Sequence, residues 1–200
     1  MNLLKKIEIS VCVALIISII FSTLCFAGTS ENIRNEVLRL HIIANSDSEK
    51  DQKLKLKVRD KLLECGSEVF CGTVTAENAV EKITPKIAEL EAVAKRVIVE
   101  NGFDYDVKIT INKEYFTTRT YKDVTLPAGK YMALRVIIGQ GNGHNWWCVM
   151  FPTMCLPAAD SSNNLEKVFD KKEVRLVKKK PAFEPRFKIV EIYESVVNHK

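Results

Sequence analysis

An uncharged, strongly apolar segment at the N-terminus is the sequence feature that most limits how this chain can fold. Residues 9–27 contain no charged side chain, and Lys5 and Lys6 form a short basic head before them. At about 1.5 Å of rise per residue, a helix of this length crosses or nearly crosses a hydrocarbon layer of ~30 Å. The small residues Ala27 and Gly28 predict cleavage after Ala27, and an uncleaved anchor is the alternative. We therefore assign residues 1–27 to a signal peptide or an N-terminal membrane anchor.

The rest of the chain, residues 28–200, is expected to form a single exported domain. Its length is sufficient for one hydrophobic core. The whole chain has a formal net charge of +5, and the N-terminal segment accounts for only one unit of it. A mildly basic balance does not indicate nucleic acid as a partner, and export argues further against one.

The periodicity of apolar residues predicts the order of the secondary-structure elements. It indicates a strand over 36–44, helices over 49–70 and 76–100, strands over 105–112, 115–121, 130–138 and 146–151, and a helix from about 184. Pro85 predicts a kink or restart of the second helix at Thr84. Because the later strands have short connections, they favour antiparallel neighbours. This order predicts an α+β fold with a mainly antiparallel sheet of about five strands and helices packed on one face.

A glycine-rich segment with both tryptophans, residues 139–157, is the least ordinary part of the exported domain. Glycines at positions 139, 141 and 143 precede His144, Asn145 and Trp146. Glycine tolerates positive φ and lets the backbone approach another surface closely, while the next three side chains offer polar and aromatic groups. The pattern is typical of a recognition loop. The alternative is a glycine-rich connection that enters a buried strand, with the tryptophans in the core.

Two segments resemble the two signatures of the stage II sporulation protein R family. The first reads Leu-Arg-Leu-His-Ile-Ile-Ala-Asn-Ser-Asp-Ser over residues 38–48 and continues through Asp51-Gln52 to residues 57–60. The second reads Gly-His-Asn-Trp-Trp-Cys-Val-Met-Phe-Pro over residues 143–152. The second is the more specific, since Trp-Trp-Cys in this setting is rare. The resemblance extends, with lower specificity, over nearly the whole exported part.

The resemblance implies a signalling protein of endospore-forming bacteria. Such proteins are made in the forespore and exported to the space between the two sporulation membranes. There they activate a membrane-embedded aspartic protease of the mother cell, which processes the precursor of the first mother-cell sigma factor. The family role is activation without catalysis, so no cofactor, metal or small-molecule substrate is expected.

We predict that residues from both signatures form one partner-binding surface patch. The residues are Arg39, His41, Asn45, Asp47, His144, Asn145 and Trp146. Tryptophan beside polar groups suits an interaction hot spot that loses its water on binding. The two segments would be adjacent if the first strand paired with the last. The alternative for His41 is a histidine on the sheet face with a satisfied hydrogen bond.

Cysteines offer an alternative function. Cys148 with His144 or His41 and Asp47 supplies the parts of a thiol hydrolase, which would act on cell-wall peptides with Cys148 as nucleophile. A disulfide between Cys148 and Cys155 is a competing explanation, and it would add roughly 2.5 kcal/mol through loop entropy. No pair of cysteines and histidines has a recognised metal-ligand spacing, so no metal site is predicted.

Two basic regions complete the sequence. Residues 166–188 contain nine basic and four acidic residues, which allows contact with an anionic membrane surface. Four lysines, at positions 50, 53, 57 and 61, lie on one stripe of the first predicted helix of the domain. For both regions the simpler interpretation is a solvated surface.

Overall fold

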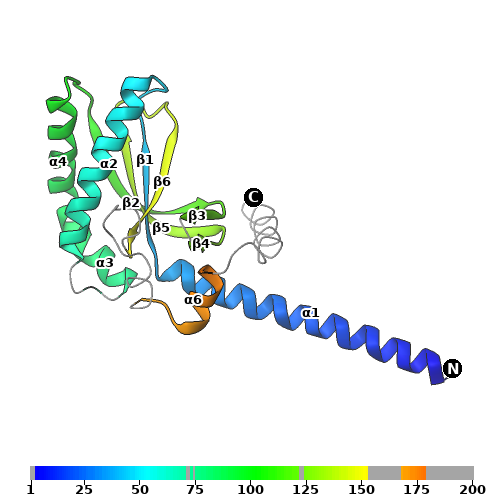
Figure 1. Ribbon diagram of the computed structural model, residues 1–200. Helices are drawn as coiled ribbons and strands as arrows, with labels where there is room; N and C mark the ends of the chain where they lie inside the picture. The colour runs from blue at the N-terminus through cyan, green and yellow to red at the C-terminus, as the bar shows by residue number, and fades with distance from the viewer. Residues whose placement is uncertain (1–2, 71–72, 74, 122–123, 153–167, 179–200) are drawn as a thin grey trace.

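The computed structural model describes residues 3–70, 73, 75–121, 124–152 and 168–178. Its elements, shown in Figure 1, are α1 (Leu3–Asn35), β1 (Leu38–Ile43), α2 (Glu49–Val69), α3 (Ala76–Ile83), the 3₁₀ turn η1 (Thr84–Lys86), α4 (Ile87–Glu100), β2 (Val107–Phe116), β3 (Arg119–Tyr121), β4 (Val124–Leu126), β5 (Gly129–Ile138), β6 (Asn145–Phe151) and α6 (Lys171–Val177). The helix predicted from about residue 184 and most of the basic region 166–188 lie outside the described residues.

Four strands form one mixed sheet in the order β2-β5-β1-β6. β5 is antiparallel to β2 and parallel to β1, and β6 is antiparallel to β1. β3 and β4 pair separately as a two-stranded hairpin. The prediction of an α+β fold with a mainly antiparallel sheet is confirmed. β1 pairs with β6, which meets the condition for the two signature segments to be adjacent.

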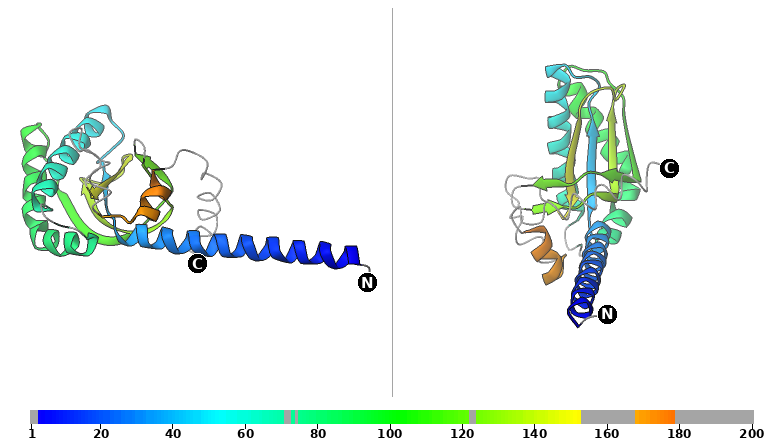
Figure 2. Two further views of the ribbon diagram at one scale, coloured as in Figure 1. Left: turned by 60° about the horizontal axis from the view of Figure 1, so that its bottom comes forward. Right: turned by 90° about the vertical axis from the view of Figure 1, so that its right-hand side faces the viewer.

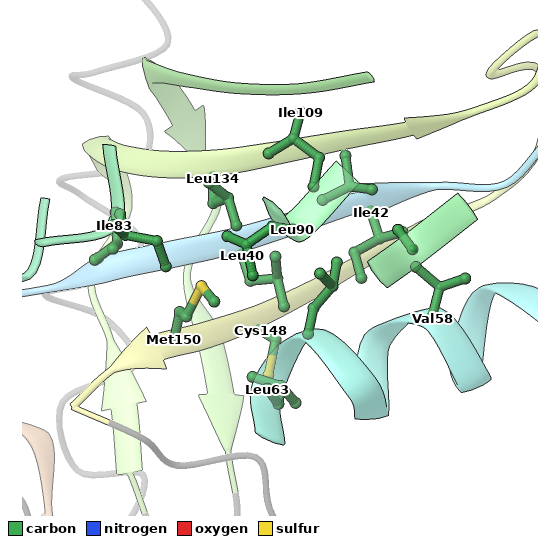
Figure 3. Close-up of a cluster of buried hydrophobic side chains, with 14 of the residues drawn as sticks. Leu40, Ile42, Val58, Leu63, Ile83, Leu90, Ile109, Leu134, Cys148 and Met150 are labelled. Atoms are coloured by element: carbon green, nitrogen blue, oxygen red, sulfur yellow. The ribbon is translucent and has the colours of Figure 1, made fainter. Parts of the chain in front are cut away.

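The helices α2, α3 and α4 cover one face of the sheet, which we call the front face (Figures 1 and 2). Alternation in β1 points Leu38, Leu40 and Ile42 toward these helices. There they join a buried cluster to which α2 contributes Leu54, Val58, Leu62 and Leu63. Figure 3 shows Leu40, Ile42 and Cys148 in this cluster, opposite Val58 and Leu63. Burial of these aliphatic side chains is the main force that holds the helices on the sheet.

A second, smaller core lies on the opposite face, the back face, and covers only part of it. It contains Phe26 and Ile33 of α1, Phe116 of β2, Leu126 of β4 and Val149 of β6, among others. The hairpin β3–β4, the end of α1 and α6 therefore cover one end of the back face. The other end, which includes Asn145 and Arg135, stays accessible to solvent.

Helix α1 is long and apolar enough to cross a membrane, and its most apolar window is only 6% buried. It continues without a break through Ala27 and Gly28 to Asn35. Its last turns pack on the domain: Ile33 is fully buried, and Nη1 of Arg34 donates to the carbonyl oxygen of Ala128 at 3.1 Å. Helix α1 leaves the sheet at the end where β1 begins, opposite to the end where α2 begins (Figure 1).

Two local predictions had different outcomes. The predicted restart at Thr84 is confirmed, since η1 separates α3 from α4 and the hydroxyl of Thr84 donates to the carbonyl of Val80 at 2.6 Å. The division of residues 105–121 into strands 105–112 and 115–121 was wrong. β2 runs without interruption to Phe116, where it pairs with Gly129 of β5, and the chain then enters the hairpin.

Candidate functional site

The two signature segments meet at the end of the sheet opposite to α1 and hold each other in one structure, which we call the clasp. It consists of the turn at residues 44–48 and the glycine loop at residues 139–145. The amide of Gly143 donates to the carbonyl of Ala44 at 2.9 Å, and the amide of Asn142 donates to the carbonyl of Asn45 at 3.2 Å. The side-chain oxygen of Asn45 accepts from the amide of Gln140 at 3.0 Å. Asn45 is therefore a structural residue that fastens the loop to the turn.

The three glycines of the loop are needed for different physical reasons. Gly139 and Gly141 have φ angles of 58° and 64°, a region that other residues rarely adopt. Gly143 has an ordinary φ, but an added Cβ would lie 2.3 Å from the carbonyl oxygen of Ser46. Both predicted uses of glycine, positive φ and close approach, are thus present. Part of what looked like a recognition loop serves to close the clasp.

Helix α2 anchors the clasp through a buried carboxylate. Asp51 accepts hydrogen bonds from Nδ2 of Asn45 at 2.9 Å and from the hydroxyl of Ser46 at 2.6 Å. Burial alone would raise the pKa of Asp51, but the hydrogen bonds from Ser46, Asn45 and other neighbours outweigh it and leave the pKa below its usual value. The carboxylate is therefore held in its charged form as the organiser of the turn.

Lys55, one turn further along α2, anchors the other side of the clasp. Its side chain is only 3% exposed, and its ammonium donates to the carbonyl oxygen of His144 at 2.7 Å. Burial lowers the pKa of Lys55 from its ordinary value. We named Asp51 within the first signature but gave it no role in the site, and we did not single out Lys55. Their helical spacing of four residues was the available signal, but on this charged helix it resembles a surface ion pair.

Asp47 and His144 close the outer rim of the clasp. The carboxylate of Asp47 accepts from the backbone amide of His144 at 2.6 Å and is also bonded to Nδ1 of the same histidine. The hydrogen bond to the His144 side chain is the largest cause that lowers the pKa of Asp47. Both side chains are exposed, at 54% for Asp47 and 78% for His144. These two predicted residues are adjacent and accessible.

Alternation along β6 separates the residues that follow. Asn145 and Trp147 point to the back face, where Asn145 bonds to His41, whereas Trp146 points to the front, where Arg59 of α2 lies 4.5 Å from its ring centroid. Trp146 is 36% exposed. In the described part of the chain, Trp146 and Val99 are the two exposed large hydrophobic residues outside α1. The seven predicted residues therefore do not form a single patch.

His41 lies at the centre of a polar and aromatic group that we call the back-face cluster. Its two ring nitrogens are 2.7 Å from Oε2 of Glu114 and 3.0 Å from Oδ1 of Asn145. Its ring stacks on Trp147 with centroids 3.7 Å apart and planes 16° apart. His41 is only 6% exposed, so it acts as a support for Asn145 and Trp147. The alternative that we gave for it, a sheet-face histidine with satisfied hydrogen bonds, matches this position.

The expectation that Arg39 lies at the surface was wrong, because its side chain is fully buried. It points to the back face beneath the hairpin, among the rings of Phe116, Tyr131 and Tyr121 at 4.1, 4.8 and 5.5 Å. Its Nη2 bonds to the hydroxyl of Tyr121, but Nε and Nη1 have no partner within the described residues. Burial lowers the pKa of Arg39. Strand alternation correctly turned Arg39 away from the helices, but it does not reveal the hairpin that covers it.

The parts of the suggested thiol hydrolase do not come together. Cys148 is fully buried in the front core, close to Leu63 (Figure 3), and its sulfur is in a disulfide. His41 lies on the opposite face of the sheet, and His144 is bonded to Asp47 at the rim. The partner of Cys148 is outside the described residues, as is Cys155, so the pairing of these two cysteines stays a prediction. Among the residues that the structure describes, no group of three or more possible metal ligands occurs.

Comparison with known proteins agrees with the two signatures. The family model for stage II sporulation protein R matches residues 34–161, which include the whole clasp. Stage II sporulation protein R of Bacillus subtilis (strain 168) is 36% identical over 133 residues, which cover 64% of this chain and 59% of the relative. The match thus spans less than two thirds of that relative's length. No solved structure matches the chain. Since the family model covers more than half of the sequence, the chain belongs to the stage II sporulation protein R family.

Proposed function

We propose that this protein is an exported sporulation signal that binds and activates a membrane-embedded aspartic protease of the mother cell, which then processes the precursor of a mother-cell sigma factor. Family membership supports a role in sporulation signalling. The observation that carries the proposal is the clasp, because it joins both signatures and its loop leaves His144, Asn145 and the next residue, Trp146, exposed to solvent. We propose that these three residues and Asp47 contact the protease. In this proposal His41 and Asn45 position the contact residues from beneath, and Arg39 packs under the hairpin without touching them.

The location that we propose is the space between the two sporulation membranes. Helix α1 supports export or anchoring, since it is long and apolar enough to span a bilayer. It leaves the domain at the end opposite to the clasp (Figure 1), so a membrane that held α1 would leave the clasp accessible. This arrangement suits a signalling protein whose partner binds from the side that faces away from the membrane holding α1.

We further propose that the protein acts by binding and has no catalytic activity of its own. The strongest support is the environment of Cys148, the candidate nucleophile. A catalytic thiolate must be accessible and within reach of a base. Cys148 is fully buried, and each of the two imidazoles that we considered has another bonding partner.

A co-expression experiment tests the proposal. The full-length protein, the protease and the sigma-factor precursor are produced together without other sporulation proteins, and the fraction of cut precursor is measured. Trp146→Ala or His144→Ala should reduce cleavage about tenfold or more, the effect of losing one hot-spot residue. Val99→Ala is the matched control, since Val99 is the other exposed large hydrophobic residue of the described domain. Wild-type activity in Trp146→Ala would refute the assignment of the contact site.

The purified protein is tested separately for hydrolysis of cell-wall peptides. We expect no hydrolysis with wild-type protein. Hydrolysis that Cys148→Ser abolishes would favour the thiol hydrolase instead.

A further inference from the structure

A cavity of about 390 Å³ opens on the front face, between the N-terminal half of α2 and the segment that follows α4. Three lysines of α2, at positions 50, 53 and 57, stand around it together with Leu54, Asn101 and Phe103. The volume falls in the range of ordinary ligand sites. The predicted patch does not include this cavity, and none of its lining residues belongs to the clasp.

The lysines of the cavity have weak partners or none. Lys53 pairs with Glu49 at 2.6 Å, but both side chains are mostly exposed, and such pairs contribute little. The ammonium of Lys57 donates to the neutral amide oxygen of Asn101. Lys50 has no ion pair in the part of the chain that the structure describes. Three ammonium groups thus surround a cavity whose lining contains no carboxylate.

Nearby acidic residues offset only part of the positive charge of the cavity. Asp104 and Asp106 follow Phe103 in the sequence, and the single ammonium of Lys95 pairs with both, at 3.1 and 3.3 Å, so one negative charge remains beside three lysines. Lys50 also lies in the first turn of α2, where the helix dipole disfavours a positive charge. A net positive charge therefore remains at the cavity for an external anion.

The floor of the cavity is apolar. Leu54 is only 2% exposed, and Phe103 is half-buried beside it. A ligand that fits must therefore carry an anionic group next to an apolar one. An acidic protein segment with glutamate or aspartate beside leucine or phenylalanine has this composition. A bilayer that held α1 would lie at the other end of the domain (Figure 1), which argues against lipid headgroups of that membrane.

We propose that this cavity binds an acidic, partly apolar segment of a partner protein through Lys50, Lys53 and Lys57. The lysines attract the carboxylates, and Leu54 and Phe103 receive the apolar side chain between them. Because its lining residues are separate from the clasp, this site can be tested without the protease.

The test uses the full-length protein in nanodiscs of zwitterionic lipid and a fluorescent peptide of alternating glutamate with phenylalanine or leucine. Fluorescence anisotropy at low salt measures binding. We expect the triple variant Lys50→Gln, Lys53→Gln and Lys57→Gln to bind about tenfold more weakly than wild type, and added salt to weaken wild-type binding. The matched control replaces the exposed lysines Lys108, Lys113 and Lys130 by glutamine, which removes the same charge elsewhere. It should change binding less than about twofold.

Several outcomes would overturn the proposal. They are the absence of wild-type binding, equal binding by wild type and the cavity variant, equal weakening in both triple variants, and equal binding of a peptide with glutamine in place of glutamate. Binding of phosphatidylglycerol vesicles, lost in the cavity variant while the peptide does not bind, would assign the site to lipid instead. Unfolding in urea is measured for both triple variants. All six lysines are exposed, and Lys57 also donates a hydrogen bond to Asn101. We therefore expect unfolding midpoints close to that of wild type for both variants.

Discussion

Replacing Gly143 by alanine should open the clasp. Gly143 has no positive φ, so alanine meets no backbone penalty there, and only the contact of the new methyl group matters. The added Cβ would lie 2.3 Å from the carbonyl oxygen and 2.6 Å from the carbonyl carbon of Ser46. Both are backbone atoms, and Nε2 of Gln52 holds that oxygen at 2.9 Å. Since ordinary contact begins at 3.4 Å, the loop and the turn must separate by roughly 1 Å.

A separation of this size would break the hydrogen bonds that close the clasp. They are the bonds from the amides of Gly143 to Ala44, of Asn142 to Asn45 and of His144 to the carboxylate of Asp47. A neutral bond contributes about 0.5–1.5 kcal/mol and one to a charged group about 1.5–3 kcal/mol. Partial relaxation recovers some of this sum. We therefore expect Gly143→Ala to lower the free energy of unfolding by about 2–4 kcal/mol.

Urea unfolding of the full-length protein in zwitterionic micelles measures this change. The two tryptophans of the chain, Trp146 and Trp147, directly follow the clasp and report on it by fluorescence. With a slope of about 1–3 kcal/mol per molar urea, the midpoint should fall by roughly 1–2 M. Gly28→Ala is the control, because a Cβ at this position in α1 has no atom within 4 Å. A midpoint for Gly143→Ala equal to that of wild type would refute the role of close contact in the clasp.

Three further predictions concern charge and sulfur. The pKa of Asp47 is lowered in the folded state. The ionised carboxylate therefore contributes stability above the unfolded pKa of about 3.9, and this contribution is lost as the pH falls through the folded pKa. The stability difference between wild type and Asp47→Asn in urea should shrink on acidification, and a constant difference would contradict this. Arg39→Met keeps the length of the side chain and removes a buried cation, two of whose nitrogens have no hydrogen-bond partner among the described residues. Its unfolding free energy should therefore stay within about 1 kcal/mol of wild type or rise, whereas Arg39→Ala should lose more than about 2 kcal/mol. A large loss in both variants would mean that the charge itself stabilises the fold. A reducing agent should lower the wild-type unfolding free energy by about 2–3 kcal/mol but leave Cys148→Ala unchanged, and equal sensitivity of both would argue against a structural disulfide.

Local sequence signals were sufficient for the elements that position the clasp. Alternation in residues 38–43 and the helical stripe of Leu54, Val58 and Leu62 predict β1 and α2. The kink at Thr84 follows from Pro85 alone. In each case the physical cause lies within a few residues of its effect, so no knowledge of the tertiary structure is needed.

Other features depend on contacts between distant segments. The strands β3 and β4 have three residues each, too few for an alternating pattern to be recognised. The hairpin nevertheless decides that Arg39 is buried, because Tyr121 of β3 lies over it. Lys55 looks like a surface lysine in the sequence, yet it is buried because the glycine loop, 89 residues further along the chain, closes over it.

The two adjacent tryptophans form one motif in the sequence, but the fold places their side chains on opposite faces of the sheet. Consecutive strand residues face opposite sides of a sheet, so Trp146 and Trp147 cannot both enter the same core. Trp147 stacks on His41 and contacts Phe116, with ring centroids 4.9 Å apart in the latter pair, so it links β6 to β1 and β2 across the back face. Trp146 has Arg59 beside it and remains partly exposed at the rim. Trp147 therefore fixes the position of β6, which in turn fixes the place where Trp146 is offered to a partner.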